Sequence, residues 1–395
     1  MLTPAGPAAS DRRSQRQAWT PLGVWSLINL ALGSVPLAEG VYISQLLLLL
    51  VCGLAVLSLA LKGHHAALSF SVLLVMALGA QSMVVGASGN PRFLPELGKT
   101  ILLLSGAVII AATVQWRDVR QLSRTVPALL CLILIPVWLS GQGDYYGDEG
   151  RFGVPWMGSP NNTGFVIAMG LALHFFHVRE TRQLRRGGVA APDVATAVVL
   201  LGFLFATQSL GGILSAAAIG LRFVGLRLGV ILWGFIGLVV CGVLVAVFVP
   251  GVEVPELLGS GRLIIWQTLL AEMFEADSLH FFLGMGPGAI DLNLWFTASV
   301  QSAHSMYVEV FYAYGLVGLL AFVATLIGIA RRIRRSPMRR DAQALLEAIF
   351  VALVIGFMVD TYVMSAQLTW FGALLFSLVG LTARADLSLQ VAPRP

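Results

Sequence analysis

The 395-residue chain is strongly apolar, since 57% of its residues are hydrophobic, only 11% are charged and the mean hydropathy is +0.84. Soluble domains carry roughly a quarter charged residues, so this composition excludes an ordinary soluble domain and indicates a polytopic membrane protein. The formal net charge of +5 does not indicate a nucleic-acid partner, because the basic residues follow a membrane-topology pattern. The three cysteines all lie in apolar runs, which argues against a disulfide framework.

In chain order, the apolar runs predict an all-α bundle of about twelve transmembrane helices at roughly 20 residues each. The expected spans are Leu22–Leu37, Val41–Leu61, Ala66–Val85, Gly98–Val114, Val126–Ser140, Thr163–Phe176, Val194–Thr207, Gly211–Phe223, Leu228–Val249, Met306–Ala330, Leu345–Tyr362 and Thr369–Leu381. We expect helices 1–9 within residues 20–249 and helices 10–12 within residues 304–384. Residues 1–19 and 385–395 are expected to be cytoplasmic tails, and residues 250–303 a large periplasmic loop between the ninth and tenth spans.

The basic residues predict the orientation of the bundle. All but four of the 25 Lys and Arg residues fall in alternate connections, and such connections lie on the cytoplasmic side of a membrane. Both termini are therefore expected in the cytoplasm and the long loop on the outer face. The four remaining cations are Arg92, Lys99, Arg151 and Arg262.

Arg262 begins a stretch in which apolar residues recur at helical spacing as far as Phe274, with polar residues on the other side. This pattern predicts an amphipathic helix on the outer membrane surface, capped by Ser260 or Gly261. A cation in the first turn opposes the helix dipole, and a bound anion such as a phosphate would explain it. The alternative is that Arg262 pairs with a nearby acidic residue, and the residues leave both open.

Arg151 lies in an irregular loop rich in Gly and Pro, just before a middle span. Irregular backbone near membrane depth is tolerated where it lines a wet cavity or is buried by protein. Asn161 and Asn162 could cap the helix that follows. Arg92 is a third outer cation, for which a surface ion pair is an equally good interpretation.

His304 opens the span after the long loop, with Ser302 and Tyr307 close by. Ionisable groups at the edge of a membrane helix are commonly functional, and an imidazole suits proton transfer. His304 is therefore a candidate catalytic base, with a packing role as the alternative. Glu309 lies a turn into the apolar run and needs a partner, for which an outer arginine is expected. The other histidines interpreted as packing residues are His174, His177 and His280.

Together these residues resemble the bacterial O-antigen ligase family, within the larger O-antigen ligase/polymerase group. The motifs that carry the resemblance are Ser260-Gly261-Arg262 with Trp266, Leu283-Gly284-Met285-Gly286-Pro287-Gly288, Ala303-His304-Ser305-Met306-Tyr307 with Glu309, and Tyr314-Gly315 with Gly318. A further match is Arg151 with Gly158, Pro160 and Asn161. One departure concerns a serine–arginine–glycine motif of the family, because this chain has Thr207-Gln208-Ser209-Leu210-Gly211-Gly212 there, without the arginine.

The resemblance implies transfer of a glycan from undecaprenyl diphosphate to a hydroxyl of the lipid A–core oligosaccharide, at the periplasmic face of the bacterial inner membrane. It implies that His304 is the base and that the diphosphate is bound by Arg151, Arg262 and Arg92. It also implies supporting roles for Glu309, Tyr307, Trp266 and Asn161. Direct attack would invert the anomeric centre. No Asp-x-Asp pair or His/Cys cluster at ligand spacing occurs on the outer side, so no metal and no cofactor is expected.

Two other functions are compatible with the sequence. The closest is a polymerase of the same fold, which would use the same donor and a different acceptor. The other belongs to a different class, a secondary transporter, for which a dozen spans would be ordinary. The low charge inside the spans and the long outer segment speak against a transporter.

Overall fold

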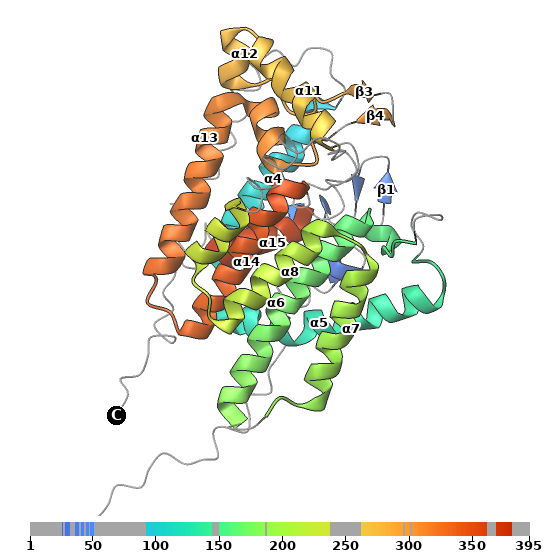
Figure 1. Cartoon of the computed structure of the whole chain (residues 1–395), viewed down its shortest axis with the longest axis vertical. Coiled ribbons are helices and arrows are strands. Elements are labelled where there is room, and N and C mark those ends of the chain that lie inside the picture. The colour runs from blue at the N-terminus through green and yellow to red at the C-terminus, as the bar shows by residue number, and fades with distance from the viewer. Residues whose placement is uncertain are drawn as a thin grey trace, which may run out of the picture.

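The computed structural model describes residues 26, 28–31, 36–38, 41–42, 45–46, 48–50, 92–143, 150–185, 188–237, 262–294, 297–300, 302–361 and 369–380. Within these residues the chain is a bundle of helices with two short antiparallel sheets (Figure 1). Four of the described helices are long and apolar enough to cross a membrane. They are α4 (Phe93–Thr113), α5 (Trp116–Leu139), α13 (Met306–Arg335) and α14 (Arg340–Val359). The predicted helical class and membrane character are therefore confirmed.

Several sequence predictions fall outside the described residues. These are both tails, most of the first three expected spans, the second half of the ninth from residue 238, and residues 250–261 at the start of the long loop. Where residues are described there, strand β1 (Pro36–Ala38) pairs with β2 (Val41–Tyr42). The predicted helix boundaries at residues 37 and 41 are thus wrong, which fits the inability of Pro36 to donate a helical hydrogen bond.

The core of the bundle forms around α6 (Pro160–Arg185), which packs against α5, α14, α7 (Ala191–Ala206) and α8 (Leu210–Val224). On the other side of α14, α15 (Thr369–Gly380) packs against α4. The largest fully buried side chains include Trp370, Phe165 and Phe357. Helices α6 and α14 are each longer than the predicted span, because both continue past the apolar run into polar turns at one end.

Two glycines let α6 and α8 approach closely. A Cβ atom on Gly212 would lie 2.7 Å from the backbone carbon of Gly164, and one on Gly164 would lie 2.8 Å from Thr207 Oγ1. Small residues at a helix contact are common in membrane bundles, where backbones pack by van der Waals contact rather than by exclusion of water. This contact fixes the start of α8 against the start of α6.

The arginines predicted to be cytoplasmic gather at one end of the bundle, which we call the basic end. There Arg120 Nε lies 2.7 Å from Glu180 Oε1, and Arg179 Nε lies 2.6 Å from Asp341 Oδ1. A third ion pair joins Arg222 of α8 to Glu347 of α14. Helix α5 also reaches this end, because it begins at Trp116 and not at Val126 as predicted, and its first turns carry basic residues.

The described part of the predicted outer loop lies at the opposite end, the site end. It forms α11 (Arg262–Glu275), α12 (Ser278–Leu283) and a hairpin of β3 (Leu292–Leu294) and β4 (Thr297–Val300) (Figure 1). The predicted amphipathic helix is present as α11. Its buried face of Ile265, Leu269 and Met273 packs on α13 and the segment after α12. These three apolar residues therefore contact protein, while Phe274 of the same helix is exposed, and the location of α11 on the outer membrane surface stays a prediction.

Helix α13 is broken at Gly315, whose backbone angles of φ 65° and ψ −169° are accessible essentially to glycine alone. The break leaves carbonyl groups without helical donors, and the glycine-rich segment 284–288 supplies them. Met285 N donates to Tyr312 O at 2.8 Å and Gly286 N donates to Ala313 O at 3.1 Å. The first two turns of α13 thus form a separate short helix, with His304 just before it.

Candidate functional site

The turn that carries His304 has a strained backbone held from several sides. His304 has φ 50°, a left-handed conformation that costs a non-glycine residue roughly 1–3 kcal/mol. Its N–H donates to Ser302 Oγ at 3.2 Å, and Trp266 Nε1 of α11 donates to Ala303 O at 2.7 Å. Such strain persists only where the surroundings determine the conformation, and it is typical of functional sites.

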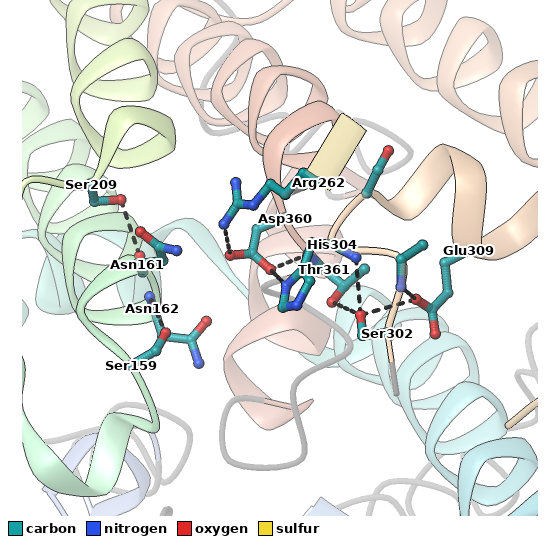
Figure 2. A network of polar contacts seen from close by, with 12 residues as sticks. Ser159, Asn161, Asn162, Ser209, Arg262, Ser302, His304, Glu309, Asp360 and Thr361 are labelled. Atoms are coloured by element: carbon teal, nitrogen blue, oxygen red, sulfur yellow. Dashed lines mark hydrogen bonds and ion pairs between the residues drawn. The ribbon is translucent and has the colours of Figure 1, made fainter. Parts of the chain in front are cut away.

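The acidic partner of His304 is Asp360, at the end of α14. Asp360 Oδ1 lies 3.5 Å from His304 Nδ1, and the same oxygen accepts a hydrogen bond from the N–H of Thr361 at 2.8 Å. The other oxygen, Oδ2, lies 3.3 Å from Arg262 Nη2 (Figure 2). One carboxylate therefore lies between the imidazole and the guanidinium group.

Exposure differs among these three side chains. That of His304 is 44% exposed, against 18% for Arg262 and 11% for Asp360. The imidazole can therefore be reached by a molecule from outside, while the two charges behind it are largely enclosed. The ring nitrogen Nδ1 of His304 faces the Asp360 carboxylate, so Nε2 is the ring nitrogen left to meet a substrate.

The sequence left two interpretations open for Arg262, an anion ligand or a partner of a nearby acid. The structure pairs Arg262 with Asp360, which is 98 residues away in the chain. It also places Arg262 at the first turn of α11, as predicted. The ion pair joins the described part of the predicted loop to the end of a core helix, so this part of the loop is positioned directly against the bundle.

Glu309 has different partners from those predicted. Its Oε2 accepts from Ala303 N at 2.8 Å and from Ser302 Oγ at 3.1 Å, in place of the expected outer arginine (Figure 2). The reason is local, because Glu309 lies one to two turns past these residues and its side chain reaches back to the strained turn. Tyr307 also acts structurally, since its hydroxyl donates to Val354 O of α14 at 3.3 Å.

A second polar cluster surrounds Arg151, between the loop before α6 and the start of α8. Arg151 Nη2 donates to Asn161 Oδ1 at 2.9 Å, and Arg151 Nε donates to Thr207 O at 3.3 Å. Ser209, the residue that caps α8, donates to Asn161 O at 3.5 Å. Arg151 therefore lies beside the stretch where the family's arginine is missing from this sequence.

The prediction that Asn161 or Asn162 caps α6 is wrong. Ser159 Oγ accepts the N–H of Asn162 at 3.1 Å, so Ser159 provides the cap and leaves the Asn161 side chain for Arg151. Asn162 donates its side-chain amide to Met157 O at 2.9 Å, after the short helix η3 (Pro155–Met157). Position favours Ser159, because it directly precedes Pro160 and proline is common at the first helical position.

The packing of α6 on α14 brings the two clusters to one end of the bundle. These helices are antiparallel neighbours joined by the Arg179–Asp341 ion pair. Along α6 from Arg179 to Asn161, and along α14 from Asp341 to Asp360, the helical rise gives about 27–29 Å in each case. Asn161 and Asp360 are therefore at about the same height, and Figure 2 shows both in one close view.

Arg92, the third predicted cation, lies at the start of α4. Its Nη1 donates to Ile290 O at 2.9 Å, and Gly288 packs against the Arg92 backbone. This contact joins α4 to the end of the glycine-rich segment. The structure thus gives Arg92 a bridging contact within the site end, whereas the sequence had offered a surface pair or a phosphate ligand.

Asp360 is the residue that the sequence analysis missed. Nothing in the sequence spacing relates Asp360 to His304 or Arg262. One signal was available, because an aspartate at the end of an otherwise apolar helix needs a partner. Thr361 was missed for a similar reason, since its hydroxyl oxygen lies 3.1 Å from that of Ser302, a residue distant in the chain.

Within the described residues, no group of three or more His, Cys, Asp or Glu side chains could hold a metal ion. No known protein-family model matches the chain, and no curated protein matches it.

Proposed function

We propose that this chain is a metal-independent glycosyltransferase of the O-antigen ligase type. In this proposal it transfers O-antigen polysaccharide from undecaprenyl diphosphate to the lipid A–core oligosaccharide. The observation that carries the proposal is the joint arrangement of His304, Asp360 and Arg262, in which a base and a phosphate-binding group share one carboxylate. The motif resemblance supplies the donor and acceptor classes.

The proposal includes the topology of a bacterial inner-membrane protein. It has about twelve spans, both termini in the cytoplasm, and the long loop between the ninth and tenth spans in the periplasm. The gathering of arginines at the basic end, together with the positive-inside rule, supports this orientation. The site end would then face the periplasm, where lipid-linked glycans are attached to the lipid A–core.

The reaction needs a base for the acceptor hydroxyl, and His304 fits that role. Its exposed imidazole takes the hydroxyl proton on Nε2 while the hydroxyl oxygen forms a bond to the anomeric carbon of the donor sugar. The bond from that carbon to the phosphate oxygen breaks on the opposite face, so the configuration inverts. Asp360 stabilises the imidazolium that forms, as carboxylates do in other catalytic dyads and triads. General base catalysis contributes roughly 10²–10⁴-fold to such a step.

The leaving group is undecaprenyl diphosphate, which gains negative charge as the bond breaks. Guanidinium groups placed in advance stabilise such charge by several kcal/mol in a water-poor site. Arg262 is adjacent to the base, and Arg151 lies in the loop before α6, where it contacts Asn161 at the start of that helix. In this proposal both bind the diphosphate, and Arg92 lies at the edge of the site.

The proposal is tested by lipopolysaccharide banding in a strain that lacks the chain. A ligase predicts loss of every laddered band, restored by the wild-type chain. Restoration should fail with His304→Ala and Arg262→Ala at equal membrane levels of protein. His280→Ala is the matched control, because His280 also pairs with an aspartate, Asp277, at 2.7 Å, but on α12 and away from the candidate residues.

The same gel separates the rival functions. If only the long ladder disappears and single-repeat material remains attached, the chain is a polymerase and the ligase proposal is wrong. If the ladder is unchanged in the deletion strain, neither glycosyl-transfer function holds, and if His304→Ala restores it fully, His304 is not the base.

A further inference from the structure

A cavity of about 870 Å³ lies at the basic end, far from the candidate site. It is bounded by the end of α8, the start of the helix Leu228–Gly237 and the basic last turns of α13. Charged side chains from three of the surrounding helices and one loop contribute to it: Arg222, Arg227, Arg334 and Glu347. None of these residues has a role in the proposed transfer reaction.

The charges lining this cavity do not balance. Arg222 Nε pairs with Glu347 Oε2 at 2.5 Å, which neutralises the single carboxylate. Arg227 and Arg334 are both exposed, and no ion pair joins either of them to a carboxylate within the described part of the chain. Two guanidinium charges therefore remain at one cavity, and two such groups bind a phosphate through charge-assisted hydrogen bonds.

Glycines keep this cavity open. Gly225, Gly229 and Gly234 line it, and a Cβ on Gly229 would lie 3.4 Å from Arg334 Nη2. The guanidinium group of Arg334 thus lies directly over the backbone at the start of the Leu228–Gly237 helix. A ligand phosphate between Arg227 and Arg334 would meet that backbone without a side chain in the way.

The rim of the cavity is apolar. Val230 and Trp233, from the same helix, are 56% and 73% exposed. Tryptophan concentrates at the membrane–water boundary, where its ring meets the headgroup region. A soluble anion has no apolar part to contact this rim, whereas the glycerol and upper acyl chains of a lipid would pack against it.

We propose that this cavity binds the phosphate headgroup of an anionic glycerophospholipid, with Arg227 and Arg334 as the phosphate ligands and Val230 and Trp233 against the lipid's apolar part. Basic pockets between membrane helices on the cytoplasmic side bind anionic lipid headgroups in this manner. The inference rests on the proposed membrane orientation of the bundle and not on its catalytic activity.

The test uses the purified full-length chain in detergent, with phosphatidylglycerol or cardiolipin as the probe and phosphatidylethanolamine for comparison. Bound lipid is measured by native mass spectrometry, and the thermal midpoint of unfolding is measured with and without lipid. We expect Arg227→Gln/Arg334→Gln to weaken binding of the anionic lipids by at least about tenfold. The matched control is Arg331→Gln/Arg332→Gln. It removes two exposed charges from α13, the helix that carries Arg334, but these residues do not line the cavity.

Retained anionic-lipid binding in the control, with loss in the cavity variant, supports the site. Equal loss in both variants would mean attraction by net charge alone and would overturn it. Equal binding of phosphatidylethanolamine, or displacement of the lipid by soluble glycerol phosphate at similar concentration, would also overturn it. His304→Ala should bind the lipid as the wild type does, so this result is independent of the proposed reaction.

Discussion

Asp360 is the residue on which the candidate site depends most. Its two carboxylate oxygens face different partners, His304 at 3.5 Å and Arg262 at 3.3 Å. Its location at the end of α14 means that a core helix, rather than the loop, fixes the distance between the base and the nearest arginine. Arg262 comes from the described part of the predicted loop and His304 from the turn directly after it, and the bundle supplies the carboxylate between them.

We therefore expect Asp360→Asn to reduce the transfer rate by about 100-fold or more, because the amide cannot stabilise the imidazolium. The loss should fall on kcat, with a smaller change in KM for the lipid-linked donor. In a double-mutant cycle, His304→Ala/Asp360→Asn should lose little beyond His304→Ala alone. Fully additive losses would show that Asp360 acts on something other than His304. Glu272→Gln is the control, because it removes a different carboxylate at the site end, the one on α11 that accepts a hydrogen bond from the Tyr312 hydroxyl.

Among individual residues, the sequence predicted the candidate site residues better than the residues that they contact. His304, Arg262 and Arg151 could be singled out because a charged group at the edge of an apolar run is uncommon. The partners Asp360 and Ser159 could not, because each is one of several equivalent residues until the chain folds. The prediction of an arginine partner for Glu309 was wrong for the same reason. Sequence spacing does not show that this side chain reaches back to the backbone of Ala303.

Among the elements, the break in α13 explains two glycine motifs together. Gly315 ends the short helix that follows His304, and Gly284 and Gly286 lie against the break. A Cβ on Gly315 would collide with the backbone of Phe282, and a Cβ on Gly284 would collide with that of Ala313. The apolar run over these residues predicted one continuous helix, because hydropathy does not report a single backbone angle.

Gly315→Ala should destabilise the protein strongly, because the backbone angles alone cost alanine roughly 1–3 kcal/mol and the clash adds to this. Gly328→Ala is a matched control in the same helix, where nothing lies within 4 Å of the added Cβ. That change should be neutral or slightly stabilising, since alanine favours a helix over glycine. Thermal unfolding in detergent checks both, and equal midpoints for the two variants would contradict the break.

A second pair of glycine variants tests the contact between α6 and α8. Gly212→Ala places a Cβ 2.7 Å from the Gly164 backbone and should push the helices apart, which disturbs the Arg151 cluster. Gly220→Ala lies on the same helix with nothing within 4 Å. We expect transfer activity to fall by at least about tenfold in the first variant and to remain in the second. Loss of activity in both would point to α8 in general and not to this contact.

For the whole molecule, the distribution of charge is the feature that the sequence predicted best. The arginines predicted to be cytoplasmic were assigned from alternation along the chain, and those of them that the structure describes lie together at one end of α5, α6, α8, α13 and α14. Three of them form ion pairs between helices there. The gathering of basic residues at one end could be predicted from their positions along the chain. The joining of α11 to the end of α14 could not, because it depends on a contact between residues 98 apart in the sequence.

The proposed orientation can be measured by cysteine labelling in a chain whose native cysteines are replaced by serine. Glu275→Cys on α11 and Arg332→Cys on α13 are both exposed and lie at opposite ends of the bundle. A membrane-impermeant maleimide should label the first in intact spheroplasts, and the second only after permeabilisation. Labelling of position 332 in intact spheroplasts would reverse the orientation and place the candidate site in the cytoplasm.

The most direct test of the central claim is glycan transfer by the purified protein in proteoliposomes. The donor is an undecaprenyl-diphosphate-linked glycan, and the acceptor is lipid A–core. We predict a product of increased mass, whose yield His304→Ala reduces at least about 100-fold and His280→Ala leaves unchanged. Transfer by the His304 variant at the wild-type rate, or no transfer by the wild type from this donor, would contradict it.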